Sequence, residues 1–90
     1  MEAEVIKANG ERFSITPKNG IDFSLQELKE IVGGWIEVVW LPNGKIMVVN
    51  EEGKCMGLAW NETATLIYAQ SRCTDIIVGD VLYCDEKMVK

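Results

Sequence analysis

The sequence predicts a small α+β domain: a strongly curved antiparallel sheet or partly open barrel of about five strands, with one or two helices. Short apolar runs separated by Asn-Gly and Pro-Asn-Gly turns predict the strands. A complete start signal at Ser24 and a Gly-Gly pair at 33–34 predict the first helix. Ninety residues suffice for one domain, which we take as residues 1–90.

Residues 5–16 are predicted to form the first β-hairpin. The Asn-Gly pair at 9–10 offers the two positive φ angles of a type I′ turn. That turn sets Ile6 opposite Phe13. The sequence Thr-Pro-Lys-Asn-Gly at 16–20 then ends the second strand.

The strongest helix signal follows. Ser24 is the expected N-cap and Glu27, three residues later, completes a capping box. Phe23 and Leu28 are spaced for a hydrophobic staple. Gly33 ends the helix because glycine enters the left-handed region without strain. The expected apolar face consists of Leu25, Leu28 and Val32.

Residues 35–50 are predicted to form a second hairpin around a type I turn at Pro42-Asn43, with Gly44 in a bulge. This register places Glu37 opposite Val49. The face expected on the core contains Ile36, Val38, Trp40, Ile46 and Val48. The other face is mixed and too apolar for solvent, so we expect the last strand, a partner subunit or a ligand to cover it. Its residues are Trp35, Glu37, Val39, Leu41, Lys45, Met47 and Val49.

The last third of the chain carries weaker signals. Asn61 is the expected N-cap of a second helix that runs to about Gln70. A final strand is predicted over 76–84, with a bulge or bend at Gly79-Asp80. The tail, residues 85–90, is expected to be frayed.

Charge and cysteine content exclude several functions. Nine basic against fourteen acidic side chains give a net charge of −5, so we expect no direct contact with nucleic acid and no adhesion to membranes. The chain has no histidine, and its three cysteines show no C-x-x-C spacing, which argues against zinc. Unpaired thiols, an acidic N-terminus unlike a signal peptide and the absence of a long apolar run predict a cytoplasmic protein. A domain this small gains from self-association, so a homodimer or higher oligomer is expected.

The region from Phe23 to Asp85 also carries a joint pattern. It consists of Leu25-Gln26-Glu27-Leu28, Ile31-Val32-Gly33-Gly34, Ile36-Glu37, Val49-Asn50-Glu51-Glu52-Gly53-Lys54, Gly57-Leu58, Asn61, Ala64, Thr65 and Ile77-Val78-Gly79-Asp80-Val81-Leu82. In these residues the chain resembles the domain of unknown function three-eight-four-six family. It departs from the family at Trp35, where members often carry tyrosine, and at Ala59, near which they often carry proline. The resemblance implies an origin in a bacteriophage or mobile element, hence the cytoplasm of a host bacterial cell, and brings no established activity.

Glu37 is the strongest single candidate for a functional residue. A carboxylate in an apolar strand would cost several kcal/mol if it were buried without a partner. The functional interpretation is a ligand contact or an acid held protonated. The alternative is that Glu37 faces solvent, or pairs with Lys45 or with a lysine of a partner.

Polar residues beside the turns form the second group of candidates. Asn50, Asn61 and Asp80, with Glu51 and Glu52, are expected either to converge on one pocket or to serve the fold. Their oxygens would suit Mg²⁺ or Ca²⁺, but their spacing matches no known metal loop. The favoured interpretation is that the amides cap or close turns. No metal and no cofactor is expected.

Two tryptophans complete the set of candidate site residues. Trp35 and Trp60 flank the predicted helix ends, where they could stack on a ligand or anchor a partner. The alternative for both is ordinary packing, which is the interpretation for Trp40 on the expected core face.

No nucleophile elbow, phosphate loop or dinucleotide fingerprint is present, and we expect no catalysis. The first hypothesis is a non-catalytic accessory protein that sequesters a small nucleotide-type ligand in counter-defence. Its ligand-binding residues would be Trp35, Glu37, Asn50, Trp60, Asn61 and Asp80. The alternative is an acidic protein-interaction module that inhibits a host enzyme through the mixed face of the second hairpin.

Overall fold

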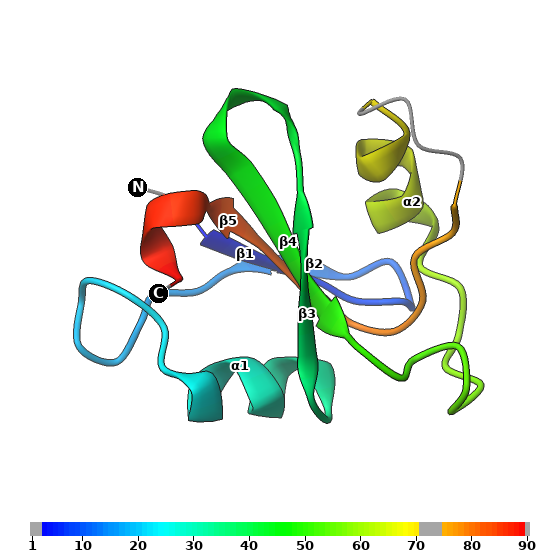
Figure 1. Ribbon diagram of the computed structural model, residues 1–90, viewed down its shortest axis with the longest axis horizontal. Coiled ribbons are helices and arrows are strands. Elements are labelled where there is room, and N and C mark those ends of the chain that lie inside the picture. The colour runs from blue at the N-terminus through cyan, green and yellow to red at the C-terminus, as the bar shows by residue number, and fades with distance from the viewer. Residues whose placement is uncertain (1–2, 71–74, 90) are drawn as a thin grey trace.

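The protein is described by a computed structural model over residues 3–70 and 75–89. Within these residues five strands form one antiparallel sheet in the order β2-β1-β5-β4-β3 (Figure 1). The strands are β1 (Ala3–Ile6), β2 (Arg12–Ser14), β3 (Ile36–Trp40), β4 (Lys45–Asn50) and β5 (Val81–Asp85), and the helices are α1 (Leu25–Val32) and α2 (Glu62–Ala69). Strands β2 and β3 are unpaired edges, so the sheet does not close into a barrel. The predicted α+β class is confirmed.

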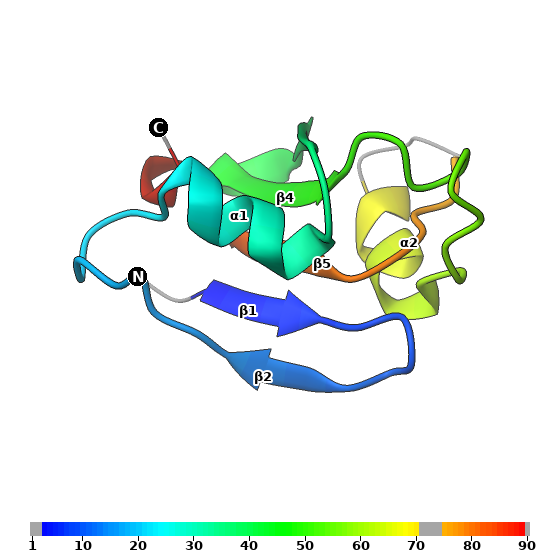
Figure 2. The same ribbon diagram turned by 90° about the horizontal axis from the view of Figure 1, so that it is seen from below.

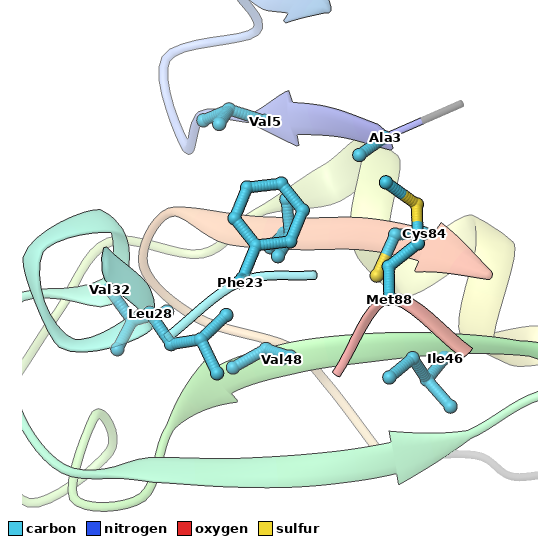
Figure 3. Close-up of a cluster of buried hydrophobic side chains, with 10 residues drawn as sticks. Ala3, Val5, Phe23, Leu28, Val32, Ile46, Val48, Cys84 and Met88 are labelled. Atoms are coloured by element: carbon cyan, nitrogen blue, oxygen red, sulfur yellow. The ribbon is translucent and has the colours of Figure 1, made fainter. Parts of the chain in front are cut away.

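Both faces of the sheet are covered, because side chains alternate along each strand. On β4, Ile46 and Val48 belong to the cluster under α1, whereas Met47 and Val49 belong to the cluster under α2. Figure 3 shows the first cluster, which consists of Ala3, Val5, Phe23, Leu28, Val32, Ile46, Val48, Leu82, Cys84 and Met88. The β4 part of the mixed face is thus covered from within the chain, whereas Trp35 and Glu37 of that face are exposed. Ile77, from the predicted final strand, contributes to this cover, and the contribution of α2 was not predicted.

The first hairpin exists, but its predicted register is wrong by one residue: Val5, not Ile6, lies opposite Phe13. The loop is longer than a two-residue type I′ turn, since the Lys7 amide donates to the Glu11 carbonyl at 2.8 Å. Gly10 alone takes a positive φ, 98°, and forms a bulge after the turn. The Asn9 side chain accepts from the Glu11 amide at 2.9 Å, which stabilises this alternative loop.

Helix α1 forms as predicted. Ser24 Oγ accepts from the Glu27 amide at 3.2 Å and the Glu27 carboxylate accepts from the Ser24 amide at 2.9 Å, which completes the capping box. Gly33 ends the helix with a φ of 81°. The expected apolar face is only partly correct: Leu28 and Val32 are buried, but Leu25 is 51% exposed. Phe23 and Met88 fill the core beside the start of the helix, which leaves Leu25 outside it.

The second hairpin has the predicted register, with Glu37 opposite Val49. Its turn is not of type I, because Asn43 has a φ of 63° where a type I turn needs a negative angle. Asparagine tolerates this left-handed conformation better than most residues. Trp40 lies at the end of an edge strand and is 66% exposed, so its expected place in the core is wrong.

The C-terminal third departs most from expectation. Helix α2 is confirmed, with the Asn61 side chain accepting from the Ala64 amide. The predicted final strand bends at Gly79, with φ 78°, and only Val81–Asp85 joins the sheet. The tail is not frayed up to residue 89: a 3-10 turn (Glu86–Met88) places Met88 in the core. The Phe23 amide donates to the Met88 carbonyl at 2.8 Å, which holds the tail beside the start of α1. Within the described part of the chain, no helix is long and apolar enough to cross a membrane.

Candidate functional site

The candidate site is a cavity of about 190 Å³ between the β3–β4 hairpin and α2. The second hairpin supplies one wall, the turn that follows β4 supplies the rim, and Tyr68 of α2 with residues 75–78 closes the other side. The lining residues are Glu37, Val39, Val49, Asn50, Glu51, Lys54, Cys55, Tyr68, Asp75, Ile76, Ile77 and Val78. Figure 1 shows α2 standing apart from the sheet on this side of the hairpin.

The alternation of side chains along β3 places two of its residues in the wall of the cavity. Glu37 and Val39 alternate with residues on the α1 side of β3, so both face α2, and Glu37 pairs with Val49 of β4. Residues 75–78 are connected to α2 by a hydrogen bond, in which the Ile77 amide donates to Thr65 Oγ1 at 2.9 Å.

Gly53 allows the turn after β4 to approach residues 75–78 closely. A Cβ atom at Gly53 would meet Val78 Cγ2 at 2.9 Å, so no side chain fits without a shift. Gly79 does the same against Leu58, where a Cβ atom would lie 2.8 Å from Cδ1. The two glycines allow the turn after β4 and the segment before β5 to approach each other closely.

The lining is acidic. Among the lining residues that the structure describes, Glu37, Glu51 and Asp75 contribute three carboxylates and Lys54 contributes one ammonium, so this set carries a net charge of −2. Lys54 Nζ donates to Asp75 Oδ1 at 2.6 Å. This hydrogen bond, with a second from the Ile76 amide, holds the pKa of Asp75 below its usual value. Because Lys54 is already engaged by Asp75, the uncompensated charge of these described residues is negative, which favours cations and disfavours phosphates.

The sequence-predicted residues divide into two groups in space. Glu37 is exposed and Asn50 is buried, and both line the cavity. The Asn50 side chain donates to the Val32 carbonyl at 3.1 Å and accepts from the Glu52 amide at 2.8 Å. It therefore joins the end of α1 to the turn after β4, as the turn-closing interpretation expects.

Asn61 and Asp80 lie outside the cavity lining. Asn61 is fully buried and its amide nitrogen donates to the carbonyls of Ile6 and Gly79, at 2.9 and 2.8 Å. Asp80 accepts from the Ala8 amide at 3.0 Å. Both side chains connect the first hairpin to the segment before β5. The five polar candidates thus do not converge on one pocket, and no group of metal-ligating side chains is found among the described residues.

The two tryptophans also lie away from the cavity. Trp35 is 56% exposed, with Lys29 Nζ 3.9 Å from the centre of its ring, a cation–π contact. Trp60 is 55% exposed, and its Nε1 donates to Thr65 Oγ1 at 3.1 Å. Their exposure fits neither core packing nor a stacking platform inside this cavity.

Several lining residues were not identified from the sequence. Tyr68 was not identified as a site residue, although it packs with the cluster under α2 that covers the mixed face of the hairpin. Lys54 and Asp75 are 21 residues apart and share no motif. Cys55 is exposed at the rim, where only the tertiary structure reveals its proximity to Glu37.

A family model described as Domain of unknown function (DUF3846) matches residues 4–88. The match therefore covers nearly the whole chain, including both hairpins, both helices and every residue that lines the cavity. It extends further towards the N-terminus than the resemblance from Phe23 to Asp85. No curated protein and no solved structure matches the chain significantly.

Proposed function

The chain belongs to the DUF3846 family, whose description names no activity, and we propose that it is a non-catalytic binding protein for a small ligand. The ligand would have an apolar body and an amino or other cationic group. The observation that carries this proposal is the acidic cavity between the β3–β4 hairpin and α2. Apolar walls with a few polar groups are typical of small-molecule sites.

The volume limits the ligand. An apolar cavity of ~150 Å³ holds a benzene molecule, and drug-sized ligands need ~300 Å³ or more. About 190 Å³ therefore suits one six-membered ring with a short substituent. Val39, Val49 and Ile77 would contact the ring, and Tyr68 supplies an aromatic surface for it.

The charge selects among ligands of this size. A primary amine or amidinium group beside Glu37 would gain a charge-assisted hydrogen bond. A phosphate would meet Glu37 and Glu51 instead, since Lys54 is paired with Asp75. A nucleotide-type ligand would thus place only its base in the cavity and keep its phosphates in solvent. In the phage or mobile-element setting that the resemblance implies, such sequestration would serve counter-defence.

The alternative function, an acidic module that docks on a host enzyme, has less support. Its expected docking surface was the mixed face of the second hairpin. Met47 and Val49 of that face are buried beneath α2 and Ile77. The cavity at the border of that face is therefore the better candidate for recognition.

The test is a thermal-shift series with four probes: benzylamine, benzamidine, benzoate and inorganic phosphate. We expect the two cations to raise the melting temperature and the two anions to leave it unchanged. Glu37→Gln should weaken cation binding about fivefold, and the exposed Glu30→Gln, which lies outside the lining, should not. Equal responses to benzylamine and benzoate, or equal responses of the two variants, would contradict the proposal. So would the absence of any shift at millimolar probe.

Cys55 gives an independent readout of occupancy. Its thiol is exposed and lines the cavity, so a bound cation should slow its alkylation by iodoacetamide. Unchanged alkylation in the presence of a ligand that raises the melting temperature would place that ligand elsewhere on the protein.

A further inference from the structure

The two edges of the sheet differ in protection. Strand β2 is short, only three residues, and carries Arg12, whose guanidinium forms an ion pair with Glu4 at 2.7 Å. Short strands and charged side chains are common ways to protect an edge from pairing. Strand β3 has five residues, Ile-Glu-Val-Val-Trp, with no lysine, arginine or proline. It is an exposed, apolar edge of the kind that natural proteins usually pair or cover.

The hydrogen bonds that flank β3 show which of its backbone groups point outward. The Glu51 amide donates to the Trp35 carbonyl at 2.8 Å, and the Leu41 amide donates to the Lys45 carbonyl at 2.9 Å. In an antiparallel pair, residues alternate between those bonded to the partner strand and those directed away. The odd-numbered residues 35–41 therefore bond to β4. The backbone N–H and C=O groups of Ile36, Val38 and Trp40 are directed to the open edge.

We propose that β3 pairs antiparallel with β3 of a second copy of this chain, about a two-fold axis at Val38. In this register Val38 lies opposite Val38 of the second copy. Ile36 of each copy lies opposite Trp40 of the other, which gives two further pairs. Each of these three pairs exchanges two hydrogen bonds, so every outward group of the strand is satisfied. A shift of two residues in either direction leaves only two such pairs within the strand.

The side chains favour the same register. On the α1 side, Ile36 of one copy contacts Trp40 of the other, an aromatic and β-branched pair that stabilises sheets. Trp40 is 66% exposed in the single chain, and this contact would cover it. On the α2 side, Glu37 of each copy lies opposite Val39 of the other. The only charged residue in the strand therefore does not lie opposite the same residue of the second copy. The strand is complementary to itself, which is why we infer a second copy rather than another protein.

The pairing joins the two sheets into one that continues through both copies. It also places Val39 of the second copy next to Glu37 at the border of the cavity. The dimer does not depend on the proposed ligand, since it rests on the strand alone. Figure 2 shows β1 and β2 on one side of the sheet and β4 on the other. The protected edge is β2, next to β1.

Sedimentation velocity over a range of concentrations tests the association. We expect the wild-type chain at twice the monomer mass, and Val38→Pro, which removes a central outward N–H at an edge where proline is tolerated, at the monomer mass. Phe13→Lys on β2 is the matched control and should remain dimeric. Trp40→Lys, at an exposed position, is a second disrupting variant should Val38→Pro not fold. A monomeric wild type, or a folded Trp40→Lys dimer of unchanged affinity, would overturn the proposal.

Cysteine cross-linking tests the register. In a Cys55→Ser, Cys73→Ser background, Val38→Cys brings two thiols to a pair whose Cα atoms lie ~5.5 Å apart, within disulfide range. Glu37→Cys places its two Cα atoms about 8 Å apart, beyond that range. We expect mild oxidation to yield a covalent dimer from Val38→Cys and not from Glu37→Cys. Equal yields, or the reverse order, would overturn the register.

Discussion

The two faces of the sheet bury side chains in different ways. Beneath α1 the cluster of ten buried residues is apolar throughout, and the helix is closed at both ends by local caps. Beneath α2 the buried set includes Asn61, a fully buried amide that bonds to two distant carbonyls, and an acidic cavity lies beside it. The α1 side also contains a buried amide, Asn50, which joins the end of the helix to the turn after β4. On the α2 side Asn61 bonds to two carbonyls that are distant in the sequence, and the cavity borders this side. We conclude that the α1 side supports the fold and that the α2 side carries the candidate site.

The largest expected effect lies on the α2 side. Asn61→Ala leaves the carbonyls of Ile6 and Gly79 and the Ala64 amide without their partner. Buried unsatisfied groups cost ~1–3 kcal/mol each, so we expect a loss of about 3–5 kcal/mol in the free energy of unfolding, measured by urea denaturation. Glu30→Ala, at an exposed position of α1, is the control and should change stability by less than about 0.5 kcal/mol. A loss near 1 kcal/mol at Asn61 would mean that the α2 side does not depend on this network.

On the α1 side the expected loss comes from packing. Leu28→Ala removes a buried side chain from the centre of the cluster, which should cost about 3 kcal/mol. Leu25→Ala, in the same helix but half exposed, should cost less than about 1 kcal/mol. Similar losses in the two variants would show that Leu28 is no more deeply packed than Leu25.

Alkaline pH offers a third comparison. Burial raises the pKa of the Cys84 thiol to about 11, from an ordinary value of 9.0. The unfolded chain therefore loses this proton first as the pH rises, and stability should fall between pH 9 and 11. We expect a loss of about 1–2 kcal/mol over this range. Cys84→Ser, which does not titrate there, should show a shallower decline, and identical pH profiles would exclude the thiol as the cause.

The smallest expected effect compares the two N-caps. Ser24→Ala removes one exposed capping bond and should cost about 1 kcal/mol. The excess cost of Asn61→Ala over Ser24→Ala then measures the two bonds from Asn61 to Ile6 and Gly79. A Ser24→Ala loss as large as that at Asn61 would remove the distinction between a local cap and a long-range connector.

Sequence patterns predicted part of the site and missed the rest. Glu37 was identified because a carboxylate in an apolar strand is unusual, and it does line the cavity. Asn50, Asn61 and Asp80 were grouped together because all three lie beside turns, yet of these three only Asn50 lines the cavity. Tyr68, Lys54 and Asp75 were not identified, because their proximity to Glu37 arises only when α2 folds against the hairpin.

The sequence by itself determined the features that depend on neighbouring residues. The capping box at Ser24 and Glu27, the glycine stop at Gly33 and the register of the second hairpin each rest on interactions within a few residues. Only the tertiary structure decided the register of the first hairpin, the burial of Met88 and the assembly of the cavity. In the hairpin two loop geometries were locally acceptable, and a one-residue shift reverses the face of every side chain. Met88 and the cavity depend on contacts between distant segments, whose free energy no local pattern reports.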